Sequence, residues 1–301
     1  MSKEGIGTFL AFLTAIVSGV SIFAYKFFIT GLDATVFTAV RAIIIGLVFL
    51  VLSFYFHSWK AKENKKIHWG YLLFIGIVGG GIAFLLFFNG LQLTTAGRAG
   101  FLHKTLPLYA TVLAFLFLKE KIGMRQGLAL LIMLAGLAVM VLSSIPAGEL
   151  WANPQLGDGL VIAATVLWAI ENVVAKKAML KGESNFVVSF SRMFFGGVLL
   201  FGIVLFMGNF DSILRLSGTQ WIYVLASSAL LFTYVLTFYW SIKYINVSKA
   251  TTILLLAPVI TLILGSMVLH EPAPAWQIVG SALILIGAYF VYGVKSEFRE
   301  I

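Results

Sequence analysis

Two charged side chains and a histidine stand inside stretches apolar enough to cross a membrane. Lys104 and its neighbour His103 lie in the apolar run 95–118, and Glu171 lies in the run 160–180. A charge near the bilayer centre costs roughly 2.5–3.5 kcal/mol on insertion scales, so each needs a compensating role. An ammonium can bind a carboxylate, a carboxylate can pair with that ammonium or carry a proton, and an imidazole can relay protons. The alternative is a set of contacts that only docks helices.

The depth of these residues favours a central site. Lys104 is nine residues from Thr95, which at about 1.5 Å per residue places it roughly 14 Å into a hydrocarbon core about 30 Å thick. Adjacent residues point about 100° apart on a helix, so His103 and Lys104 can share one cavity only at its edges. We hypothesise that Lys104 binds an anionic group, with Glu171 paired to it or carrying a coupling proton.

Aromatic and polar residues near mid-span are further candidates for substrate contact. Aromatic rings could stack on an organic solute or hold a cation by cation–π contact. Each could instead be an ordinary interfacial or lipid-facing residue. These candidates are Trp168, Tyr234, Tyr239, Trp240 and Asn89.

Two prolines and two arginines are candidates for hinge or gating roles. Pro107 and Pro258 each remove an intrahelical hydrogen bond and kink their helices, which frees carbonyls to line a cavity or form a hinge. Arg41 and Arg192 occupy equivalent positions in two runs. For the arginines, a structural role and a gating or substrate role both remain open.

Composition defines the class of protein that must position these residues. The chain has 301 residues, of which 60% are hydrophobic and 11% charged, with a mean hydropathy of +1.02. Soluble domains carry about 25% charged residues, and continuous apolar runs of about 20 residues indicate helices rather than a β-barrel. The sequence therefore predicts an all-α integral membrane protein. It has no cysteine, which excludes disulfides and thiolate metal sites.

Hydropathy predicts ten membrane spans. They cover residues 6–29, 34–56, 69–93, 95–118, 124–145, 160–180, 185–207, 219–245, 247–269 and 275–294. If both termini are cytoplasmic, fifteen of the 21 lysines and arginines lie on the cytoplasmic side and three on the other. The net charge of +9 is then explained by cytoplasmic loops rather than by nucleic-acid binding. We predict a multi-pass protein of the cell membrane, with its first span retained.

The chain repeats itself at an offset of 151 residues. The halves are residues 1–146 and 158–301, joined by a connector at 147–157. Because each half contains five spans, the second half is predicted to lie inverted, and the charge of the equivalent loops reverses accordingly. Inverted repeats are typical of transporters that alternate between inward-open and outward-open states around a midplane site. Matched pairs are Pro107 with Pro258, Arg41 with Arg192, Gly136 with Gly287, and Glu120 with Glu271, the last expected to fix helix ends through local hydrogen bonds.

These matched segments resemble the EamA-like group of the drug/metabolite transporter superfamily. The resemblance covers about residues 6–294 and is carried by Pro107…Leu118-Lys119-Glu120, Pro258…Leu269-His270-Glu271, Gly136 and Gly287. It implies two inverted five-helix bundles around a central cavity lined by the first four spans of each half. The group includes amino-acid and metabolite exporters and many members of unknown substrate. The sequence departs from the usual pattern at His103-Lys104 and Glu171.

Motifs for an ATP motor, a zinc protease or a serine hydrolase are absent, so we expect no cofactor and no enzymatic activity. We predict a secondary transporter of small organic solutes, such as amino acids or related metabolites, working by alternating access. Proton coupling through Glu171 or His103, export and a homodimer are further hypotheses. The partners are the solute, the bilayer and, under coupling, protons. The alternatives are a lipophilic-cation or drug exporter, a non-transporting scaffold, or an intramembrane enzyme.

Overall fold

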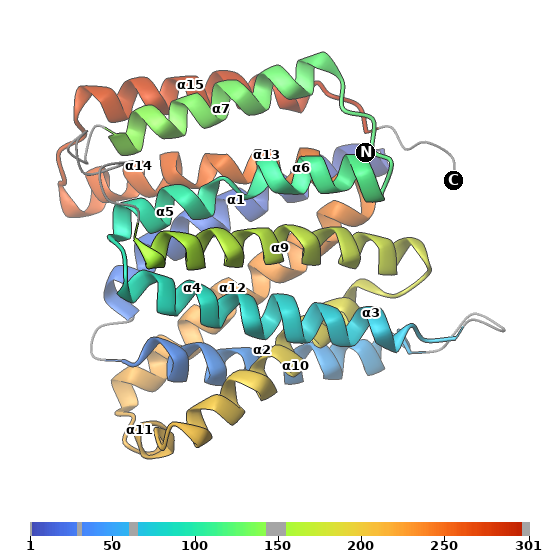
Figure 1. Ribbon diagram of the computed structural model, residues 1–301, viewed down its shortest axis with the longest axis vertical. Coiled ribbons are helices and arrows are strands. Elements are labelled where there is room, and N and C mark those ends of the chain that lie inside the picture. The colour runs from blue at the N-terminus through green and yellow to red at the C-terminus, as the bar shows by residue number, and fades with distance from the viewer. Residues whose placement is uncertain (1, 29–31, 60–65, 143–154, 297–301) are drawn as a thin grey trace.

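The structure is a computed structural model that describes residues 2–28, 32–59, 66–142 and 155–296 (Figure 1). Within these ranges the secondary structure is helical, and ten helical segments are long and apolar enough to cross a membrane. The predicted all-α membrane fold is confirmed. The connector is described only from residue 155 onward, and the predicted end of the fifth span at residue 145 lies outside the described residues.

The observed helices follow the predicted spans closely. In the first half they are α1 (Lys3–Phe28), α2 (Ala34–Tyr55), α3 (Trp69–Phe74), η1 (Ile75–Ile82), α4 (Ala83–Gln92), α5 (Ala96–Lys104), α6 (Leu106–Phe117) and α7 (Met124–Leu142). In the second half they are α9 (Leu156–Leu180), α10 (Asn185–Phe206), α11 (Phe210–Leu214), α12 (Gly218–Tyr244), α13 (Val247–Ile253), η2 (Leu254–Leu256), α14 (Ala257–Leu269) and α15 (Ala275–Tyr292). The short α11 was not predicted.

The fourth span of each half is broken, as its proline predicted. α5 ends at Lys104 and α6 begins at Leu106, with Pro107 in its first turn. In the second half the 3₁₀ segment η2 separates α13 from α14, again with proline in the first turn of the following helix. Proline lacks the N–H that would continue the preceding helix, and its ring clashes with the carbonyl four residues earlier. At the offset of 151, His103, Lys104 and Thr105 correspond to the three leucines of η2.

The two halves interlock through equivalent helices. α2 packs on α10 and α7 packs on α15, while α1 packs on α12 and α14, and α9 packs on α4 and α6. Gly46 and Gly197 occupy equivalent positions in the two repeats, and both lie where α2 crosses α10. A Cβ at Gly46 would lie 2.7 Å from the Phe194 Cα, and one at Gly197 would lie 2.9 Å from the Ile43 nitrogen. Glycine at both positions lets the two backbones approach closely.

The directions of the helices fit the repeat. In Figure 1 the two fourth spans run in opposite directions, α5–α6 toward the end that carries both labelled termini and α13–α14 away from it. α9 begins at the opposite end of the molecule from α1. The orientation of the two halves relative to a membrane stays a prediction.

Candidate functional site

A π-helical turn brings the third span against the buried charges. η1 carries Gly76, Gly79, Gly80 and Gly81, and it packs on α9 and α10. A Cβ at Gly79 would lie 2.2 Å from the Glu171 Cγ, and one at Gly80 would lie 1.9 Å from the Arg192 carbonyl oxygen. π-turns inside α-helices often mark functional sites. The glycine run was visible in the sequence, but neither the π-turn nor its contact with Glu171 and Arg192 was predicted.

Glu171, Arg192 and Tyr239 form a buried cluster where α9, α10 and α12 meet. The Glu171 side chain is fully buried and accepts hydrogen bonds from the Arg192 Nη1 at 3.0 Å and from the Tyr239 hydroxyl. The same Nη1 lies 3.2 Å from the Tyr239 hydroxyl oxygen. A buried charge needs a charged, hydrogen-bonded partner to offset its desolvation. The partner of Glu171 is therefore Arg192, and Lys104 is not in contact with it.

Arg41, which is equivalent to Arg192 in the first repeat, has different partners. The Arg41 Nη1 donates to the Tyr25 hydroxyl at 2.8 Å, and its guanidinium carbon lies 4.3 Å from the centre of the Phe37 ring. In the first half, the position equivalent to Glu171 is Val20. Cation–π contact and one hydrogen bond thus replace the ion pair of the second half. The two arginines therefore occupy equivalent positions in the sequence repeat but make different kinds of contact.

A second cluster lies beside the break in the fourth span. The His103 ring centre is 4.9 Å from that of Trp168 and 5.2 Å from that of Phe87. The indole Nε1–H of Trp168 donates to the Gly79 carbonyl at 2.9 Å. The His103 Nδ1 is buried and has no hydrogen-bond partner among the residues that the structure describes. These contacts hold the imidazole in an aromatic setting.

Lys104 is partly exposed at the carboxyl end of α5. In the described part of the chain, its ammonium has no hydrogen-bond or ion-pair partner. The helix dipole favours a cation at this end of α5. The equivalent residue in the second half is Leu255, so the two breaks differ in polarity.

The remaining predicted residues divide between these clusters and other places. Tyr234 stacks on Phe238, whose ring in turn lies against that of Tyr239 in the buried cluster. Asn89 is exposed and donates to the Leu85 carbonyl of its own helix at 2.8 Å, away from both clusters. Trp240 packs on Phe186 and Tyr244 near the end of α12, also apart from them.

Trp168 joins the two clusters. It lies three residues before Glu171 on α9, so the two side chains occupy neighbouring positions on one face. Trp168 touches His103, and Glu171 holds Arg192. Only one helical turn of α9 therefore separates the aromatic contacts at the break in the fourth span from the buried ion pair.

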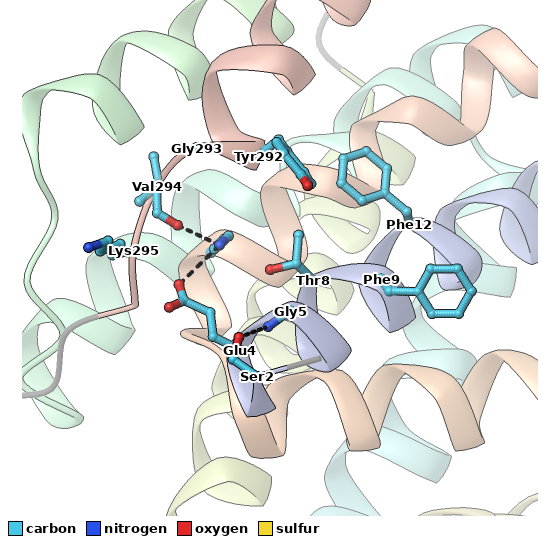
Figure 2. Close-up of a pocket in the computed structure, with 11 residues that line it drawn as sticks. Ser2, Glu4, Gly5, Thr8, Phe9, Phe12, Tyr292, Gly293, Val294 and Lys295 are labelled. Atoms are coloured by element: carbon cyan, nitrogen blue, oxygen red, sulfur yellow. Dashed lines mark hydrogen bonds and ion pairs between the residues drawn. The ribbon is translucent and has the colours of Figure 1, made fainter.

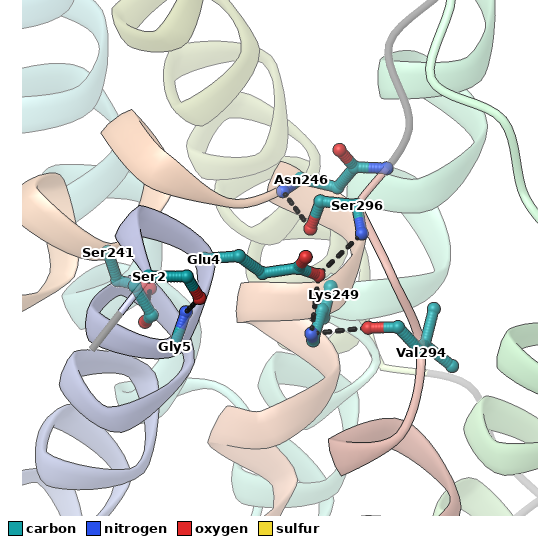
Figure 3. Close-up of polar contacts among 9 residues, drawn as sticks. Ser2, Glu4, Gly5, Ser241, Asn246, Lys249, Val294 and Ser296 are labelled. Atoms are coloured by element: carbon teal, nitrogen blue, oxygen red, sulfur yellow. Dashed lines mark hydrogen bonds and ion pairs between the residues drawn. The ribbon is translucent and has the colours of Figure 1, made fainter.

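Two ion pairs, one at each end of the bundle, join helices of the two halves. Arg98, in the first turn of α5, pairs with Asp158 in the first turn of α9. Lys249, in the first turn of α13, lies 3.4 Å from Glu4 in the first turn of α1 (Figure 3). Arg98 and Lys249 are separated by the repeat offset. Each pair closes the junction between the fourth span of one half and the first span of the other.

Glu120 also links the halves, which corrects the expectation that it fixes a helix end through local hydrogen bonds. Its carboxylate accepts the backbone N–H groups of Val247 at 2.7 Å and Ser248 at 3.1 Å, and the Ser248 hydroxyl at 2.6 Å. It therefore caps α13, in the opposite half. Burial raises the pKa of the Glu120 carboxyl above its usual value, against the opposing effect of these hydrogen bonds.

Ten apolar helices, two broken spans and a buried ion pair define a polytopic helical membrane protein. The model of the EamA-like transporter family matches residues 5–142 and 155–293. The chain belongs to this family of membrane transporters, as the resemblance predicted.

Relatives of the chain are themselves named as uncharacterized transporters. The Bacillus subtilis transporter YetK is 28% identical, over 98% of this chain and 89% of that protein. A transporter of Archaeoglobus fulgidus is 25% identical, over 93% of this chain and 96% of that protein. A solved crystal structure shares 16% identity and a TM-score of 0.79, covering 95% of this chain and 98% of that one, which shows the shared fold alone.

Proposed function

We propose that this protein is a secondary transporter of small organic solutes that carry a carboxylate, such as amino acids or related metabolites. The observation that carries the proposal is the ammonium of Lys104 at the break in the fourth span, which has no partner among the described residues. At the same break, the neighbouring His103 contacts the rings of Trp168 and Phe87. Broken helices form the substrate sites of many transporters, because their ends expose polar groups within the membrane. The solute carboxylate would bind Lys104, and its apolar part would lie against these rings.

A carboxylate is favoured over a lipophilic cation. Glu171 was the residue that would have bound a cation, but Arg192 and Tyr239 already occupy its oxygens. In the second half the break is lined by leucines and offers no charge. The charge that remains for a substrate at the break is therefore positive.

Alternating access would use the crossed ion pairs at the two ends. The Arg98–Asp158 and Lys249–Glu4 pairs are both formed in this structure. Opening toward one side of the membrane would break one pair while the other holds the opposite end closed. The halves 1–146 and 158–301 would act as the two repeats that exchange conformations, with net movement of solute out of the cell.

Changing Lys104 to alanine tests the substrate site. A hydrogen bond to a charged group contributes about 1.5–3 kcal/mol, so we expect the KM for a carboxylate solute to rise roughly 10- to 150-fold. Uptake into proteoliposomes of purified protein would be measured for amino acids, organic acids and lipophilic cations. Lys104→Arg should retain part of the affinity, and Lys177→Ala, at an exposed lysine of α9, is the matched control. Unchanged affinity in Lys104→Ala would contradict the assignment, and solute binding without flux would contradict transport.

Proton coupling would act through Glu171. Protonation would remove the charge that holds Arg192 and so would loosen α9 from α10 and α12. We expect Glu171→Gln to lose proton movement driven by the solute, as reported by a pH-sensitive dye inside proteoliposomes. The exposed Asp211→Asn is the control. Proton movement equal to wild type in Glu171→Gln would assign Glu171 to helix docking alone.

A further inference from the structure

A polar pocket opens at the end of the molecule that carries both termini (Figure 2). It has a volume of about 460 Å³ and lies between the first turns of α1 and the residues that follow α15. Its polar lining includes Lys249, Lys295, Glu4 and Thr8. Because α1 begins at Lys3 and α15 ends at Tyr292, the pocket lies where the spans end. In a membrane this level is the headgroup region.

An apolar groove adjoins this pocket. It also has a volume of about 460 Å³ and runs between α1, α14 and α15. Both depressions are lined by Phe12 and Tyr292, so they share a boundary. Ile16 and Ile263, which line the groove, are 49% and 48% exposed, so the groove faces the surroundings of the bundle. Its further lining includes Val259, Ile260, Leu285 and Tyr289.

Among the residues that the structure describes, one positive charge of the polar pocket has no opposite charge paired with it. The Glu4 carboxylate accepts the Ser296 backbone N–H at 2.6 Å and lies 3.4 Å from the Lys249 ammonium (Figure 3). Lys249 also donates to the Val294 carbonyl at 2.5 Å. Lys295 is exposed and has no ion-pair partner among the residues with described positions. With Glu4 neutralised by Lys249, the charge left for a ligand is that of Lys295.

We propose that the pocket and groove together bind one anionic phospholipid from the leaflet at this end of the protein. The phosphate would lie in the polar pocket beside Lys295 and Lys249, and an acyl chain would follow the groove along α1 and α14. Tyr292 lies at the boundary, the level at which tyrosine is enriched in membrane proteins. Lysines near a membrane surface favour anionic lipids.

The charge of the pocket selects an anionic over a zwitterionic lipid. The ammonium of phosphatidylethanolamine would meet Lys295, and the carboxylate that could receive it, Glu4, is already engaged. Phosphatidylglycerol brings the same phosphate without that ammonium. The choline group of phosphatidylcholine meets the same repulsion, so this lipid serves as the zwitterionic comparison.

Native mass spectrometry of the purified full-length protein, titrated with phosphatidylglycerol or phosphatidylcholine, tests the site. One lysine near the membrane surface contributes about 1 kcal/mol toward anionic lipid, so we expect Lys295→Gln to weaken phosphatidylglycerol binding about fivefold without weakening phosphatidylcholine binding. Lys177→Gln, at an exposed lysine of α9, should bind both lipids like wild type. Ile263→Trp would fill the groove and should weaken binding of both lipids. Leu131→Trp, at a residue of α7 that is 61% exposed, is its control.

Three results would overturn the proposal. The first is equal affinity of the wild type for the two lipids, which would remove the selection by charge. The second is an equal loss of phosphatidylglycerol binding in Lys177→Gln and Lys295→Gln, which would attribute the loss to the general positive charge of the surface. The third is unaltered binding in Ile263→Trp, which would separate the lipid from the groove. None of these readouts depends on transport, so they stand apart from the tests of the proposed function.

Discussion

Replacing Glu171 with alanine is expected to lower the free energy of unfolding by about 3–5 kcal/mol, because removing one partner of a buried ion pair leaves the other charge uncompensated. Arg192 is 9% exposed and would remain buried at the junction of α9, α10 and α12 without its carboxylate. The Tyr239 hydroxyl would also lose its acceptor. The measurement is the equilibrium of unfolding by sodium dodecyl sulfate in mixed micelles, followed by circular dichroism.

Two comparisons separate the buried ion pair from a general effect of removing a carboxylate. Asp211→Ala breaks an ion pair at the surface, in which the Asp211 side chain is 74% exposed and that of Arg215 is 83% exposed. This substitution should change the free energy of unfolding little. The double variant Glu171→Leu with Arg192→Leu removes both charges and should be more stable than Glu171→Ala. If Glu171→Ala matched Asp211→Ala, the ion pair would not stabilise the fold.

Gly80→Ala is expected to destabilise the protein by about 3 kcal/mol, the upper end of the usual cost of overpacking. The added Cβ would lie 1.9 Å from the Arg192 carbonyl oxygen and 3.0 Å from the Gly196 Cα. Both contacts are with the backbone of α10, so no side-chain rotation can relieve them. The π-turn would have to move away from α10, which also displaces it from Glu171.

Gly70→Ala is the matched control in the same span. Nothing lies within 4 Å of a Cβ added there, and alanine favours the helix by up to about 1 kcal/mol over glycine. The two substitutions should therefore have opposite signs in the same unfolding assay. Solute uptake by Gly80→Ala should fall as well, since the turn packs on both residues of the ion pair. Equal stability of the two variants would mean that the close approach of η1 and α10 is not required.

The spans and the broken fourth helices could be predicted because hydropathy and proline act locally. A run of apolar residues defines a span, and Pro107 and Pro258 interrupt their helices whatever surrounds them. The α5–α6 break falls within two residues of Pro107, and η2 ends two residues before Pro258. Family membership followed from the same segments and their spacing.

The partners of the charged residues could not be predicted in the same way. Sequence position gives the depth of a residue in the membrane but not the direction in which its side chain points. Lys104 and Glu171 are both near mid-span, which favoured their pairing, yet Glu171 lies against Arg192 and Tyr239. The same limit applies to Glu120, which caps a helix 127 residues away along the chain. The π-turn has no local sequence rule, although its glycines indicated a close contact.

Because α1 packs against helices of the second half, these contacts cannot form until most of the chain has been synthesised. The Thr14 hydroxyl bonds to that of Thr237, 223 residues later, and the Thr261 hydroxyl donates to the Gly19 carbonyl. At a synthesis rate of about 5–20 residues per second, roughly 10–45 s pass between the emergence of the first residue of the Thr14–Thr237 pair and that of the second. During this time α1 resides in the membrane without α12 and α14, its native neighbours from the second half. Its own hydropathy, rather than its final contacts, must hold it there until α12 and α14 arrive.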